Sequence, residues 1–280
     1  MVFIRLLSAR CGGWGRVLPG FGTKTGVTSS QVLVRTPQAA ASRYSLLLTT
    51  DSDEVRAAQR LRHRVFAGEL GAVLHGSEPG LDTDRFDAFC DHVVVRDDAS
   101  GEIVGTYRML PPERARAAGG LYADGEFEID ELAPLRPSLV ETGRSCVHPD
   151  HRDGAVVGLV WAGIAQYMLR TGNRWLVGCA SVPLTDGGGL AAGVRDRVLA
   201  RHLSPEPYRV RPRLPWDPAG ITPPSRAPLP PLLRGYLRLG AWVCGAPAHD
   251  PDFGCADFLV LLGLDHMDGR YLRFFLGEQA

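Results

Sequence analysis

The chain has 280 residues, of which 45% are hydrophobic and 22% are charged, with 31 basic and 31 acidic side chains. This composition excludes a disordered or collagen-like chain and provides enough apolar residues for the core of one or two domains. Residues 1–50 contain six basic residues and no acidic ones, so residues 51–280 hold 25 basic and 31 acidic residues. That net charge of −6 argues against a nucleic-acid partner.

The first 43 residues are rich in Gly, Ser, Thr and Arg, and we interpret residues 1–43 as a basic, disordered leader ahead of a single domain over residues 44–280. A transit peptide or a tail that favours an anionic membrane surface is the alternative. The longest uncharged apolar run, residues 154–165, has 12 residues, whereas a spanning helix needs roughly 20. The six cysteines have neither disulfide-framework nor metal-ligand spacing, so we expect reduced thiols, a cytoplasmic protein and no metal site.

Hydrophobic periodicity predicts alternating strands and helices from residue 44 onward. In chain order we expect a strand at 44–49, a helix capped by Asp51 or Ser52 that includes Val55, Ala58, Leu61, Val65 and Phe66, strands at 92–96 and 103–110, a strand at 139–147, a helix at 155–171, a strand at 175–182 and a helix at 193–202. This order predicts a mixed α/β fold.

The last third of the chain is dominated by proline. Residues 204–231 contain ten of the 21 prolines, which excludes a regular helix or a central strand. A domain linker and an ordered excursion over the surface are both compatible with that composition. We expect a helix at 232–242, a strand at 257–262 and a last helix at 267–276 after it.

The most informative stretch is residues 141–155, where a strand ends, a short turn follows and an apolar helix begins. The first N–H groups of a helix and the positive end of its dipole attract anions. A phosphate group could therefore bind at Arg152, Asp153, Gly154 and Ala155, and a plain structural turn is the alternative.

Residues 147–154 (VHPDHRDG) resemble the pyrophosphate-binding motif of the GNAT acyltransferase superfamily. Four segments, residues 61–66, 84–87, 105–110 and 141–144, recur in this order in two GNAT branches: the acyl-homoserine-lactone synthases and the ornithine N-acyltransferases of ornithine-lipid synthesis, often labelled hemolysin-like. The tail from residue 236 to residue 275 resembles the second branch. Val156 stands where the usual pattern has a further glycine, which leaves room for an acyl-carrier-protein donor instead of coenzyme A.

The resemblance implies a GNAT-like twisted mixed β-sheet flanked by helices. It implies transfer of a long-chain, 3-hydroxyacyl group from the thioester of acyl carrier protein or coenzyme A to the α-amino group of ornithine or a similar amino acid. The acyl-phosphopantetheine thioester is then a donor substrate, and no bound cofactor or metal is needed. An acyl-homoserine-lactone synthase-like enzyme and a non-catalytic protein that binds acyl carrier protein or lipid are the alternatives.

Arg64, Arg108 and Arg144 lie on the same resembling segments as the carboxylates of Asp84, Asp87 and Glu141. Buried charges must be paired, so an ion-pair network and a substrate site both explain Arg64, Asp84 and Asp87. Charged side chains are costly in apolar strands, which favours a functional role for Glu141.

We assign Glu141 as the general base or as the anchor of the amine, because amide formation needs a neutral amine. We assign Arg108 and Arg144 to orienting the substrate or the thioester oxygen. Cys146 lies in a strand without an evident base, so an acyl-enzyme is disfavoured.

Two apolar features have a functional and an ordinary interpretation. Phe66, Phe86 and Phe89 line an acyl tunnel or belong to the core. Residues 229–243 combine Leu, Tyr and Trp with two arginines, which suits an interfacial helix in contact with membrane lipid or a helix that packs on the core.

Overall fold

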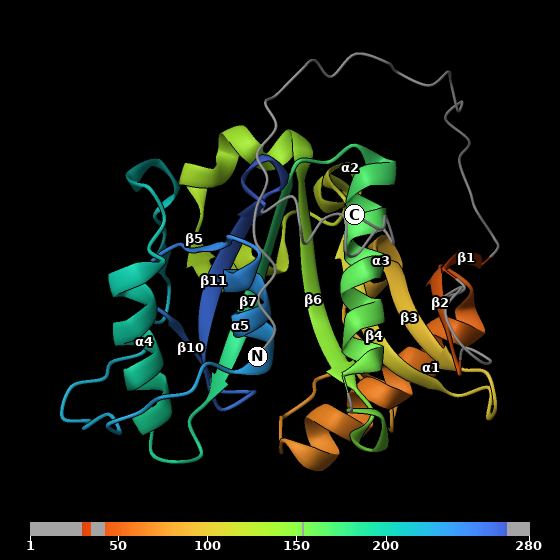
Figure 1. Ribbon diagram of the computed structural model, residues 1–280, viewed down its shortest axis with the longest axis horizontal. Coiled ribbons are helices and arrows are strands. Elements are labelled where there is room, and N and C mark those ends of the chain that lie inside the picture. The colour runs from red at the N-terminus through yellow and green to blue at the C-terminus, as the bar shows by residue number, and fades with distance from the viewer. Residues whose placement is uncertain (1–29, 35–42, 153, 268–280) are drawn as a thin grey trace, which may run out of the picture.

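The computed structural model describes residues 30–34, 43–152 and 154–267, and their main feature is a mixed sheet (Figure 1). Within these residues nine strands form one sheet in the order β1-β2-β3-β4-β6-β7-β11-β10, with β9 paired to β11. Their bounds are β1 Gln31–Val34, β2 Tyr44–Thr49, β3 Asp91–Asp97, β4 Ile103–Leu110, β6 Leu139–Val147, β7 Trp175–Pro183, β9 Trp242–Val243, β10 Ala248–Asp250 and β11 Cys255–Gly263. Two short strands, β5 (Phe127–Glu128) and β8 (Arg211–Pro212), pair separately.

Helices cover both faces of the sheet, as the mixed α/β prediction requires. On one face α3 (Ala155–Thr171), α4 (Gly189–Arg201) and α5 (Pro231–Arg238) enclose the larger core. On the other face α1 (Ser52–His63) packs on β4 and β6, and α2 (Pro112–Ala117) belongs to the long segment that connects them. Figure 1 shows α3 along the strands β3 and β4.

The first helix forms for the reasons that the sequence suggests. The Asp51 side chain accepts hydrogen bonds from the N–H groups of Asp53 and Glu54, and Ala58 and Leu61 are buried. The helical backbone then continues as a π-helix over Arg64–Glu69, which buries Val65 and Phe66 as expected.

Several predicted boundaries are wrong. Strand β1 lies inside the segment that we assigned to a disordered leader, because Leu33 is buried and the strand pairs antiparallel with β2. The helix predicted at 232–242 ends at Arg238, and Trp242 joins β9. The proline-rich segment is an ordered excursion, since Val210 and Pro215 pair with the backbone next to β9 and β10. The helix predicted at 267–276 and the rest of the leader lie outside the described residues.

Strands β6 and β7 are the parallel pair of the described sheet, and they pair only over their first halves. The register runs from Leu139 opposite Trp175 to Thr142 opposite Gly178, although both strands continue well beyond these residues. The last pair is very close: a Cβ atom on Gly178 would lie 2.7 Å from the Thr142 carbonyl oxygen. The strands therefore touch at Gly178 and separate after it.

A β-bulge in β6 begins where the two strands separate. Thr106 of β4 lies opposite Cys146 and Arg108 lies opposite Gly143, so β6 has one extra residue here. Arg144 takes a left-handed conformation, with φ of 57°, which is uncommon for a residue with a side chain. The bulge turns the Arg144 side chain toward the space between the strands.

Candidate active site

A cavity of about 490 Å³ occupies the separation between β6 and β7. Gly143, Arg144 and Ser145 line it from β6, and Cys179 and Ser181 line it from β7. The other walls come from five segments: the π-helix, the turn before β3, the segment before β5, the loop before β11 and β11 itself. They contribute Phe66, Phe86, Tyr122, Phe253 and Asp257 respectively. Its size and its mixture of aromatic and polar walls suit a small-molecule substrate.

Glu141 lies at the base of this cavity, on the paired part of β6. Its carboxylate is buried and accepts backbone hydrogen bonds from Tyr122 (2.7 Å) and Ala123 (2.8 Å). Burial raises the pKa of Glu141 to about 7. The two N–H donors and the charge of Arg108 limit this increase, because they stabilise the carboxylate form. Since each carboxylate oxygen has two lone pairs, both oxygens can still accept a proton from a substrate. A buried carboxyl with this pKa is suited to general base catalysis near neutral pH.

Beside Glu141, arginines and aspartates form a closed ion-pair network. Nη1 of Arg108 donates to Asp84 Oδ1 at 2.6 Å and to Asp87 Oδ1 at 3.1 Å. Although burial alone would raise the pKa of the Asp84 and Asp87 carboxyls, the neighbouring arginines hold both well below their usual range. Arg108 also lines the cavity, where its guanidinium contacts the two aspartates and lies 5.8 Å from the ring centroid of Phe86.

The third arginine of the network was predicted wrongly. Arg64 is exposed, and its guanidinium contacts His148 at 2.6 Å instead of either aspartate. Arg62 takes the predicted place: it is 0% exposed and donates to Asp82 at 2.8 Å and to Asp87 at 2.8 and 2.9 Å. The reason is helical geometry, because position 62 lies on the buried side of α1.

Arg144 joins this network to the cavity. Its guanidinium lies 3.3 Å from carboxylate oxygens of Asp82 and Asp84. It also lies 5.1 Å from the ring centroids of both Tyr122 and Phe253, which is within range of cation–π attraction. The side chain is thus fixed between two rings with part of its charged surface toward the cavity.

The predicted phosphate turn lies beside the cavity, not in its lining. Gly154 has φ of 101°, and α3 begins after it without a side-chain cap. Arg152 forms a two-point ion pair with Glu69 (2.6 and 2.7 Å), and Glu69 does line the cavity. Asp153 lies outside the described residues. The structure therefore places Arg152, Gly154 and Ala155 near one end of the cavity without bringing them into contact with Glu141.

Comparison with known proteins gives the family. The GNAT acetyltransferase domain model matches residues 61–162. An L-ornithine N(alpha)-acyltransferase of Rhizobium meliloti is 39% identical over 250 residues, which covers 81% of this chain and 82% of the relative. One from Rhodobacter capsulatus is 36% identical and covers 85% and 96%. The chain belongs to the L-ornithine N(alpha)-acyltransferase family.

Among solved structures, this acyltransferase is similar to a CoA-dependent acyl-homoserine lactone synthase, with a TM-score of 0.47, 16% identity and coverage of 82% and 84%. The predicted GNAT-like fold and the assignment as an amide-forming acyltransferase are confirmed by the family match.

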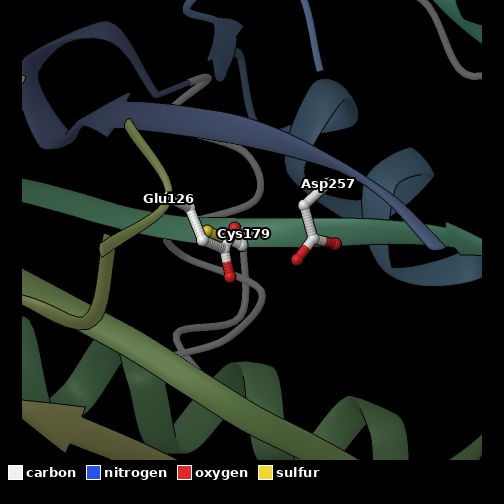
Figure 2. Close-up of side chains that lie close together, drawn as sticks. All are labelled: Glu126, Cys179 and Asp257. Carbon is white, nitrogen blue, oxygen red and sulfur yellow. The ribbon is translucent and has the colours of Figure 1, made fainter. Parts of the chain in front are cut away.

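Sequence reasoning missed a second group of titratable residues, at the wall of the cavity that β7 and β11 form. The group contains Glu126, which precedes β5, Cys179 of β7 and Asp257 of β11 (Figure 2). A carboxylate oxygen of each acid and the Cys179 sulfur lie within 4.8 Å of one another. Burial raises the pKa of Glu126 to about 9, with a further contribution from the charge of Asp257, whose pKa is also raised, mainly by burial. Asp257 interrupts an apolar strand as Glu141 does, and that signal would have found it.

The sequence left open whether the phenylalanines and the amphipathic helix of this acyltransferase serve its substrates or the core. Phe66 and Phe86 line the cavity, whereas Phe89 packs against the adjacent core. The apolar side of α5 is buried through Leu233, Tyr236 and Leu237, so that side packs on the sheet and is not presented to lipid. No described helix is long and apolar enough to span a membrane.

Four of the described cysteines are buried and Cys179 is partly buried. Cys146 is buried, and burial raises its pKa to about 12. This argues against a thiolate nucleophile at neutral pH. The five described cysteines are free of disulfides.

Proposed function

We propose that this acyltransferase moves a long-chain acyl group, of the 3-hydroxyacyl type, from a phosphopantetheine thioester to the α-amino group of ornithine. The observation that carries the proposal is the buried Glu141 carboxylate, with a pKa near 7, at the base of the cavity between β6 and β7. The curated relatives, named for the same transfer to L-ornithine, support this acceptor.

The chemistry follows from the groups around the cavity. The α-ammonium of the acceptor gives one proton to Glu141, and the neutral amine attacks the thioester carbonyl carbon. A C–N bond forms and the C–S bond breaks, so the products are the amide, the free pantetheine thiol and one released proton. Direct transfer suits this site because Cys146 is held as a thiol.

The donor enters, in this proposal, along the separated strands. The phosphate of the pantetheine arm binds near Gly154 and the N-terminus of α3, where helix N–H groups favour an anion. Arg152 is paired with Glu69, so a phosphate at Arg152 would have to replace that carboxylate. Val156 packs against Gly105 of the sheet, and the space that a further glycine would open is filled. We infer that acyl carrier protein, whose arm has a single phosphate, is the donor and partner.

Mass spectrometry of the products tests the proposal directly. Purified protein is mixed with 3-hydroxyacyl carrier protein and a pool of free amino acids, and a parallel reaction contains the acyl-CoA. We expect N-acylornithine with the carrier-protein donor. A product that forms only when S-adenosylmethionine is added would instead identify a lactone synthase-like enzyme.

The Glu141→Gln variant tests the base. We expect kcat to fall by about 10²–10⁴-fold, the usual contribution of a general base. Wild-type kcat/KM should rise with pH through about 7 as Glu141 loses its proton, and that rise should flatten in the variant. A variant that keeps its fold by circular dichroism and also keeps wild-type turnover would exclude Glu141 as the base.

A further inference from the structure

The wall of the cavity formed by β7 and β11 carries carboxylates that no described cation neutralises. Asp257 lies opposite Ser181 in the ladder and is 3% exposed. Asp250, at the end of β10, is also buried in this wall and lines the cavity. On the opposite side, by contrast, every aspartate of the network contacts an arginine.

Glu126 has the least satisfied side chain of the group. Both of its carboxylate oxygens are buried, and neither has a hydrogen-bond partner among the described residues. Tyr122 and Cys179 lie next to it and partly stabilise its charge, but they make no hydrogen bond of normal geometry. An unsatisfied buried carboxyl is costly in free energy, so a hydrogen-bond donor of a substrate is its natural partner.

The charges around the cavity have a definite polarity. Arg144 presents a guanidinium from the bulge of β6, Glu141 a carboxylate from the paired part of β6, and Asp257 a carboxyl group from β11. Glu126 lies behind the lining, beside Asp257. An amino acid with a cationic side chain carries the complementary pattern: a carboxylate, an α-ammonium and a second ammonium. Figure 2 shows the carboxyl groups of Glu126 and Asp257 near one another, with Cys179 beside Glu126.

We propose that Asp257 and Glu126 form the specificity site of this enzyme and bind the side-chain ammonium of the acceptor. Arg144 then faces the acceptor carboxylate, and Glu141 faces the α-ammonium. This inference rests on the proposed function, to which it adds the residues that select a diamino acid over a neutral one. The second ammonium supplies the positive charge that both carboxyls lack and the N–H donors that Glu126 lacks, whereas Asp257 already accepts a hydrogen bond from the Cys255 thiol at 3.4 Å.

Competition between ornithine and norvaline tests the site, because norvaline has the same carbon chain without the side-chain amine. With the donor held constant, the ratio of kcat/KM for ornithine to that for norvaline should fall at least about tenfold in Asp257→Asn. That is the loss expected for one hydrogen bond to a charged group. Glu126→Gln should lower the ratio in the same direction.

The matched control is Glu128→Gln, two residues from Glu126 but exposed. This variant should keep the wild-type ratio. If Asp257→Asn and Glu126→Gln also keep that ratio, the specificity site is wrong even though the acyltransfer stands. A wild-type protein that holds one equivalent of Zn²⁺ through dialysis, and loses it in Glu126→Gln, would also overturn the proposal in favour of a metal site.

Calorimetry separates this inference from the proposed function. If no amino acid is acylated, the proposed function fails, and binding of ornithine and norvaline to the wild type is measured without turnover. Tighter binding of ornithine that is lost in Asp257→Asn would support the cation site on its own. Equal binding of the two amino acids would overturn it.

Discussion

The two sides of the cavity treat buried carboxylates in opposite ways. On the side of α1, Arg62 and Arg108 neutralise Asp82, Asp84 and Asp87 within a few ångströms. On the side of β11, Asp257 and the carboxylate oxygens of Glu126 are buried without a described ion pair to an arginine. The first arrangement is complete in the protein alone, which indicates a structural role. The second is incomplete, which indicates that a ligand completes it.

The largest expected effect follows from breaking the complete side. Arg62→Met removes a fully buried guanidinium and leaves Asp82 and Asp87 without their main partner. Loss of one partner from a buried ion pair costs about 3–5 kcal/mol, so the free energy of unfolding should fall by that amount. Urea unfolding followed by circular dichroism measures it.

Arg56→Met is the control for Arg62. Arg56 also forms a two-point ion pair, with Glu78, but both side chains are about half exposed. Exposed ion pairs contribute little because water competes for both charges. The comparison breaks down if the two substitutions destabilise the protein equally.

A smaller effect is expected where the two sides meet. Gly178→Ala places a methyl group 2.7 Å from the Thr142 carbonyl oxygen, so β6 and β7 must move apart. Overpacking of this kind costs about 1–3 kcal/mol, and the displaced Glu141 should lower kcat. Gly158→Ala in α3 is the control, since its methyl group meets open space and should stabilise the helix. Unfolding measurements that show the same sign for both variants would contradict the close contact at Gly178.

Local patterns in the sequence predicted the six longer strands of the sheet and the principal helices, and they drew attention to Glu141, which is buried in the lining of the cavity. The same patterns could have identified Arg62 as the arginine of the ion-pair network. Positions 58, 61, 62 and 65 follow the helical repeat, so Arg62 lies on the buried side of α1 and Arg64 does not. Asp257 is a charge in an apolar strand and could have been recognised in the same way as Glu141.

Other features depend on contacts that no local pattern contains. Glu126 lies in a connection with no regular repeat, and only the fold brings it to β7 and β11. The bulge at Arg144 arises from the register between β4 and β6, which the sequence of β6 alone does not determine. The point where β6 and β7 separate depends on how these two strands pair with each other, which the sequence of neither strand gives alone.

The smallest expected effect concerns the pH dependence of stability on the incomplete side. The pKa of Glu126 rises from 4.5 to about 9 on folding, so its contribution to stability is complete below pH 4.5 and is lost as pH rises through about 9. The aspartates of the arginine network have lowered pKa values and behave oppositely, losing their contribution as pH falls.

Because Glu141 titrates near pH 7 and the thiols with raised pKa values are present in both proteins, the difference between the wild type and Glu126→Gln from pH 7.5 to 9 isolates Glu126. Over that interval Glu126 should lower the free energy of unfolding by up to about 1.4 kcal/mol per pH unit, the value for one proton bound on folding. The decrease should be smaller in Glu126→Gln and unchanged in Glu128→Gln. Saturating ornithine should reduce it in the wild type as well, since an ammonium bound between the two carboxyls replaces the proton. Identical curves for the wild type and Glu126→Gln would mean that Glu126 is already neutralised within the protein, and the contrast between the two sides would disappear.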